Sequence, residues 1–352
     1  MLMKVMYALL ILVPLTIVLE FGNIGGHSTI FVVSGLAMIP LAALLGQATE
    51  QAAHYTGPKI GALLNATLGN AAELIITIIA LREGLTEVVK ASIAGSVIGN
   101  ILIVLGLSLL FGGLKNGTQE FDGHTAGVNA TMMALAVVVL CVPAVVALGD
   151  SHLRPSDRDI ERLSDGMAIV MIALYVLYLL YTLRGGKTNI TEADGSHHAT
   201  MKLPVAIGIL TGATVAIVIV SEILVGALEP TAASWGLSEF FIGIMIVPLI
   251  GNIAEHLVAV QVAVQNKMDL SLGIAVGSGL QIATFVTPVL VLAGWAMGTP
   301  MTLVFNNYEL MALIGATFIA VLISVDGKSN WLEGAQLVGL YAVLTLAFYF
   351  VP

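Results

Sequence analysis

The sequence predicts an all-α polytopic membrane protein of about 11 transmembrane helices, built as two inverted five-helix repeats plus one extra N-terminal helix. Two observations lead to this class. First, 58% of the 352 residues are hydrophobic, only 10% are charged and the mean hydropathy is +1.00, which is typical of a chain that faces lipid. Second, apolar runs of membrane length recur along the chain, and one short motif occurs twice, at 69–73 and 251–255.

A helix needs about 20 apolar residues to cross the hydrocarbon core of a bilayer. The runs that approach this length are 5–20, 28–46, 60–81, 87–111, 126–148, 164–182, 204–227, 240–264, 270–297, 310–325 and 331–351. We interpret the first as a retained span, with a cleaved signal peptide as the alternative. The resulting organisation is an extra helix at 1–27, a first repeat at 28–183, a cytoplasmic linker at 184–203 and a second repeat at 204–352.

The two motifs indicate an internal duplication. Glu255 lies 182 positions after Glu73. The same offset relates further pairs, namely Asn70 and Asn252, Gly95 and Gly277, and Ser96 and Ser278. Each repeat holds an odd number of spans, so the second must enter the membrane from the opposite side. Inverted repeats of this kind are usual in secondary transporters, whose binding sites lie near the bilayer midplane where the repeats meet.

Charge and cysteine content indicate where the protein lies in the cell and which classes of partner it can have. If the runs alternate across the membrane, eight basic residues fall on the N-terminal side and five on the other, which predicts a multi-pass protein of the cell membrane with a cytoplasmic N-terminus. The partners expected are the lipid bilayer and transported ions. The net charge of −9 without a basic patch argues against nucleic acid, and the single Cys141 excludes disulfides. Whether copies form a homo-oligomer is left open.

Glu73 and Glu255 are the strongest candidates for a functional site. A charged side chain in the middle of a span costs about 2.5–3.5 kcal/mol on insertion scales, so such residues are usually functional. The alternative is a structural hydrogen bond between helices, which the presence of a glutamate in both copies of the motif makes less favoured. Gly69 before the first glutamate and Pro248 before the second predict a kink or break in each helix.

Polar residues at helical spacing surround the two glutamates. They are Asn70, Asn252, Ser96, Ser278, Asn100 and Gln281. Inverted symmetry would gather them into one site that offers only oxygen ligands and two negative charges. A flexible set of carboxylate, amide, hydroxyl and carbonyl oxygens suits Ca²⁺. For the asparagines the alternative role is to cap kinked helices, and for the serines it is close helix packing.

The paired carboxylates also suggest how transport is coupled. No cation lies in these helix cores, and two bare carboxylates facing each other at low dielectric repel and are poorly solvated. The site therefore has two roughly neutral loaded forms, one with Ca²⁺ and one with two protons, whereas the empty form should not reorient. Two roles are open for His256, which is next to Glu255. It either relays protons or forms a hydrogen bond with a neighbouring helix.

Other classes of function have less support. An intramembrane hydrolase would need a cluster such as His-Glu-x-x-His, which is absent from the sequence, so we expect neither an enzyme nor a cofactor. A cation channel usually builds its filter between subunits, whereas two inverted halves already complete a site here. The remaining alternative is a Na⁺- or K⁺-coupled exchanger of Ca²⁺ or Mn²⁺.

The motifs resemble those of the cation/proton exchangers of the Ca²⁺/cation antiporter superfamily. The match is Gly-Asn-Ala-Ala-Glu-Leu at 69–74 and Gly-Asn-Ile-Ala-Glu-His at 251–256, supported by 48–50, 238–241 and 277–281. The Na⁺/Ca²⁺ branch has proline directly before the glutamate, so Ala72 and Ala254 favour the proton-coupled branch. The resemblance implies Ca²⁺/H⁺ antiport in which Glu73 and Glu255 bind Ca²⁺ and protons in turn.

Some polar residues remain ambiguous. Glu50, Glu222 and Glu239 lie at the ends of spans and either collect ions or are ordinary interfacial acids, the second being favoured. The linker carries Glu192, Asp194, His197 and His198, too few acids to predict a strong acidic regulatory helix.

Overall fold

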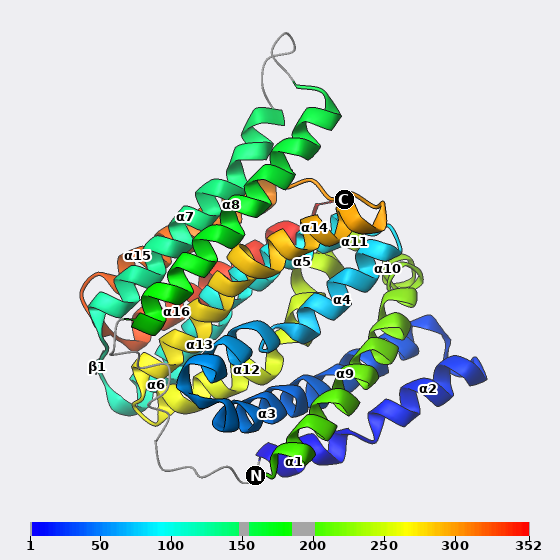
Figure 1. Ribbon diagram of the computed structural model, residues 1–352, viewed down its shortest axis with the longest axis horizontal. Coiled ribbons are helices and arrows are strands. Elements are labelled where there is room, and N and C mark those ends of the chain that lie inside the picture. The colour runs from blue at the N-terminus through cyan, green and yellow to red at the C-terminus, as the bar shows by residue number, and fades with distance from the viewer. Residues whose placement is uncertain (1, 148–154, 185–200, 352) are drawn as a thin grey trace.

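The computed structural model describes residues 2–147, 155–184 and 201–351 and is almost wholly helical there (Figure 1). The first half contains α1 (Leu2–Leu9), α2 (Leu12–Gly22), α3 (Gly26–Leu68), α4 (Ala71–Arg82), α5 (Thr86–Gly99), the π-helix η1 (Asn100–Val104), α6 (Leu105–Asn116), β1 (Gln119–Glu120), α7 (Gly123–Ala147) and α8 (Asp157–Arg184).

The second half contains α9 (Leu203–Gly226), α10 (Leu228–Trp235), α11 (Glu239–Phe241), η2 (Ile242–Ile246), α12 (Val247–Val264), α13 (Met268–Gln281), η3 (Ile282–Val286), α14 (Thr287–Met297), α15 (Asn307–Ser324), β2 (Lys328–Ser329) and α16 (Trp331–Tyr349). Asparagine capping boxes start α15 and α16, where Asn306 and Asn330 accept hydrogen bonds from the first turn. The two short strands pair antiparallel.

Ten helices in the described part of the chain are long and apolar enough to cross a membrane. They account for all the predicted spans except 60–81. The run at 60–81 does not form one continuous helix, because α3 ends at Leu68 and α4 begins at Ala71. A turn at Gly57, whose φ of +79° is accessible to glycine, separates this run from the predicted span at 28–46.

The predicted duplication is visible in the backbone. The π-helices η1 and η3 begin at Asn100 and Ile282, which are 182 positions apart. The left-handed residues Gly84 (φ +84°) and Asn266 (φ +62°) keep the same offset. Beyond α7 the register drifts, since α8 and α16 begin 174 positions apart, at Asp157 and Trp331. The fold therefore has the inverted repeats that the sequence predicts.

The two repeats differ at the motif helices. The chain breaks at Gly69 and Asn70, and Asn70 becomes the N-cap of α4 with φ −98° and ψ 20°. Of the kink or break predicted for the second copy, the break is absent, because the chain stays helical through η2 and α12. Pro248 has no N–H to donate to the carbonyl of Ile244, four residues earlier. Ile244 lies in the π-helix η2, so the missing hydrogen bond falls in this wider helical turn.

The helices are arranged in three groups around the motifs. The equivalent helices α3 and α9 pack against each other, with α1 and α2 beside them at one edge of the molecule (Figure 1). At the opposite edge lie α7, α8 and α15, while α5, α12 and α13 run through the middle (Figure 1). These central helices and α4 carry the predicted site.

Candidate functional site

Each motif glutamate packs against the glycine of the other motif. A Cβ atom at Gly251 would lie 3.0 Å from Oε1 of Glu73, and one at Gly69 would lie 3.8 Å from Oε1 of Glu255. Glu73 is 8% exposed. The absence of a side chain at Gly251 leaves room for the Glu73 carboxylate, whereas Gly69 and Glu255 are at ordinary contact distance.

One half of the site is a connected chain of hydrogen bonds. Asn70 Nδ2 donates to Gln281 Oε1 at 2.6 Å, and the Ser278 hydroxyl donates to Asn70 Oδ1 at 3.3 Å. Asn100 Nδ2 donates to Ser278 Oγ at 3.3 Å. These bonds join α4, η1 and α13, so side chains from both repeats are fixed together.

The other half centres on Asn252 and has fewer bonds. Asn252 Nδ2 donates to Ser96 Oγ at 3.3 Å and to the Pro248 carbonyl at 3.0 Å. All six polar residues predicted beside the glutamates therefore lie in two networks at the junction of α4, α5, α12 and α13.

Four buried oxygens at this junction have no hydrogen-bond donor among the described residues. They are Glu73 Oε2, Glu255 Oε2, Asn100 Oδ1 and Asn252 Oδ1. Buried polar atoms are normally bonded, so the arrangement calls for a cation or protons. No group of three or more His, Cys, Asp or Glu in the described ranges could hold a metal. A cation bound here would be coordinated by two carboxylates together with amide and hydroxyl oxygens.

His256 lies beside the Asn252 half of the site. It is 9% exposed and lines a small cavity with Ser96, Asn252 and Tyr341 of α16. Sequence reasoning identified His256 but missed Tyr341, because the offset between the repeats is lost before α16. It also missed Thr77, whose hydroxyl donates to the Glu73 carbonyl at 2.6 Å.

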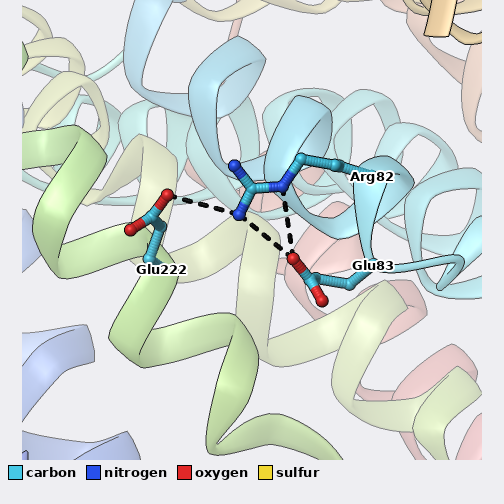
Figure 2. A network of polar contacts seen from close by, with 3 residues as sticks. All are labelled: Arg82, Glu83 and Glu222. Carbon is cyan, nitrogen blue, oxygen red and sulfur yellow. Dashed lines mark hydrogen bonds and ion pairs between the residues drawn. The ribbon is translucent and has the colours of Figure 1, made fainter.

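Glu222 is held in a surface ion network. Arg82 at the end of α4 contacts Glu222 of α9 at 3.2 Å and its neighbour Glu83 at 3.0 Å (Figure 2). All three side chains are about half exposed, so solvent screens these ion pairs and they add little to stability. Glu50 and Glu239 are exposed. The linker residues Glu192, Asp194, His197 and His198 lie outside the described residues.

Comparison with known proteins extends these observations. The family described as sodium/calcium exchanger protein matches residues 27–184 and 205–350. A Ca²⁺/H⁺ antiporter of Aphanothece halophytica is 44% identical over 99% of this chain and 97% of its own length. A Ca²⁺/H⁺ antiporter of Synechocystis is 42% identical over 99% of this chain and 98% of its own.

Solved structures agree with this result. The crystal structure of the Ca²⁺/H⁺ antiporter protein YfkE superimposes with a TM-score of 0.85 at 40% identity, covering 99% of this chain and 100% of that one. These matches confirm the resemblance seen in the paired motifs. The chain belongs to the sodium/calcium exchanger protein family.

Proposed function

We propose that the protein is a secondary antiporter that exchanges cytosolic Ca²⁺ for H⁺ by alternating access, with Glu73 and Glu255 binding either Ca²⁺ or protons. The observation that carries this proposal is the reciprocal packing of each glutamate against the glycine of the other motif. One carboxylate from each inverted half then serves a single site, which both halves can reshape together.

The chemistry of the site supports Ca²⁺ as the cargo. The set of carboxylate, amide and hydroxyl oxygens suits a hard divalent ion that takes 6–8 oxygen ligands at roughly 2.3–2.6 Å. The four unbonded oxygens of Glu73, Glu255, Asn100 and Asn252 are available to it, with Asn70, Gln281, Ser96 and Ser278 as the surrounding ligands and supports. The names of the relatives, Ca²⁺/H⁺ antiporters, agree with this cargo and with proton coupling.

Coupling follows from charge. Two carboxylates that face each other at low dielectric without a cation repel each other and are poorly solvated, so the doubly charged empty site is the least favourable form. Ca²⁺ or two protons neutralise it, and only a neutral site crosses between the two faces of the membrane at low cost. His256 takes part in proton coupling in this scheme, and the N-terminus lies in the cytoplasm.

A pH gradient alone should drive Ca²⁺ transport. In proteoliposomes loaded at acidic pH and diluted into alkaline medium without Na⁺ or K⁺, we expect ⁴⁵Ca²⁺ to accumulate and a protonophore to abolish the accumulation. The control is the same vesicle preparation with equal pH on both sides. Uptake that appears only after Na⁺ or K⁺ is supplied would contradict proton coupling and favour the alkali-metal alternative.

A further inference from the structure

Each glycine that a motif glutamate packs against has a residue one helical turn before it on the same face. Asn65 precedes Gly69 by four residues, and its carbonyl accepts a hydrogen bond from the Gly69 N–H at 2.8 Å. Val247 precedes Gly251 by the same interval within α12. Residues four apart share one face of a helix. Asn65 and Val247 also correspond by the 182-residue offset, so in the inverted repeats they lie one turn from the site on its two opposite sides.

These two corresponding residues have different surroundings. The Asn65 side chain is exposed, whereas Val247 is only 5% exposed. The motif helices beyond the glutamates show the same difference, because Val258 of α12 is 42% exposed and its counterpart Ile76 of α4 is 2% exposed. We call the side of the site with Asn65 and Val258 the open half, and the side with Val247 and Ile76 the closed half.

Aliphatic side chains fill the closed half. The Thr77 hydroxyl donates to the Glu73 carbonyl at 2.6 Å, so the packing begins one turn beyond this glutamate. A hydrated cation cannot pass between such side chains, because it would lose water without gaining oxygen ligands. The residues that meet here around one small cavity include Ile76, Val88, Val89, Leu224, Val225 and Val247.

The open half has small residues at the corresponding positions. Leu224 of α9 corresponds to Ala42 of α3, and Leu228 corresponds to Gly46. Both leucines are buried, whereas Ala42 and Gly46 are partly exposed. A Cβ atom at Gly46 would meet no described atom within 4 Å. The chain therefore leaves space on the side of the site where Asn65 lies.

The open half leads to the face of the protein where the linker ends. The segment that carries Asn65 follows the turn at Gly57. Two residues before this turn, the Tyr55 hydroxyl donates to the carbonyl of Met201, just before α9, at 2.7 Å. In the proposed function this face is cytoplasmic, and it is the face from which Ca²⁺ is taken.

We propose that Ca²⁺ reaches the paired glutamates through the open half and that Asn65 is the first protein ligand it meets. The inference rests on the proposed function, which makes Ca²⁺ the cargo. The amide oxygen of Asn65 replaces one water of the hydrated ion while the ion is still in contact with solvent. Val247 offers no oxygen at the corresponding position of the closed half, so the ion has no such step on that side.

The accessibility of two introduced cysteines tests the route. Cys141→Ala removes the native cysteine, and Asn65→Cys or Val247→Cys is added to that protein in everted membrane vesicles. With a charged, membrane-impermeant thiosulfonate we expect Asn65→Cys to react at least about 10-fold faster than Val247→Cys, because a thiol reacts as thiolate in water. Ca²⁺ should slow the reaction of Asn65→Cys. Equal rates for the two cysteines, or an Asn65→Cys rate that Ca²⁺ leaves unchanged, would overturn the proposal.

Asn65→Val, which copies the closed half, tests the role of the amide. In everted vesicles of the full chain we expect the half-saturating Ca²⁺ concentration for pH-driven ⁴⁵Ca²⁺ uptake to rise by about 5- to 10-fold, with the maximal rate within about twofold. Asn65→Asp keeps an oxygen and should restore the low value. The matched control is Thr67→Val, which removes a hydroxyl of the same segment that bonds only the Leu63 carbonyl among the described residues.

Asn65→Ala serves if the valine variant does not fold, as judged by size-exclusion chromatography. An unchanged half-saturating concentration would overturn the proposal. A lower maximal rate at an unchanged half-saturating concentration would also overturn it, because Asn65 would then act on the fold and not on the ion. Failure of the proposed function is distinguishable, since the unmodified protein would then show no pH-driven uptake.

Discussion

Replacing either Glu73 or Glu255 by glutamine is expected to abolish pH-driven Ca²⁺ transport. Glutamine keeps the size of the side chain but cannot release or take up a proton. A bound Ca²⁺ would then face one carboxylate only, leaving a buried charge unbalanced. Such charges cost about 3–5 kcal/mol, and since about 1.4 kcal/mol is a factor of ten, the initial rate of ⁴⁵Ca²⁺ uptake should fall by at least about 100-fold.

Glu239→Gln is the matched control for these variants. Glu239 begins the segment that leads to Glu255, but its side chain is exposed and lies outside the site. Its substitution should leave the uptake rate unchanged. Normal transport by Glu73→Gln and Glu255→Gln, with all three proteins monodisperse, would show that the site does not need the paired carboxylates.

Gly95→Ala is expected to destabilise the protein strongly, whereas Gly277→Ala is not. A Cβ atom at Gly95 would overlap the Ile244 carbonyl oxygen and lie 2.8 Å from Pro248 Cγ. The obstacle is the backbone of the π-helix η2, which cannot move aside as a flexible side chain would. Overpacking typically costs about 1–3 kcal/mol and occasionally more, and we expect a value at the upper end of this range.

Gly277 provides the comparison because it is the equivalent residue of the other repeat and has open space around its Cα. Alanine there gains up to about 1 kcal/mol of helix propensity. Thermal unfolding in detergent should therefore show a much lower midpoint for Gly95→Ala and an unchanged or slightly higher one for Gly277→Ala. Equal midpoints would mean that η2 shifts to accommodate the methyl group.

The architecture was predictable from the sequence because the offset between the motifs is constant. Once Glu73 and Glu255 are related by duplication, an odd number of spans per repeat fixes the inversion, and inversion brings Asn70 towards Ser278 and Gln281. The predicted break at Gly69 was confirmed. The same Gly-Asn pair at 251–252 stays helical within α12, so the pair alone does not determine a helix end.

The differences between the halves were harder to predict. The break occurs in one copy only, because Pro248 follows a π-helical turn that absorbs its missing hydrogen bond, and π-turns have no clear sequence signal. The small cavity beside Asn252 is lined by residues of both repeats. Tyr341 completes the cavity from a helix where the register between the repeats has drifted, so only the tertiary structure reveals it.

The central claim is that Glu73 and Glu255 share one ion. The most direct measurement is anomalous diffraction from crystals soaked in Ca²⁺ or a heavier divalent analogue. The account predicts a single peak between the two side chains, within about 2.3–2.6 Å of a carboxylate oxygen from each, and its loss in crystals of Glu73→Gln. A peak bound by only one of the two glutamates, or by neither, would contradict the account.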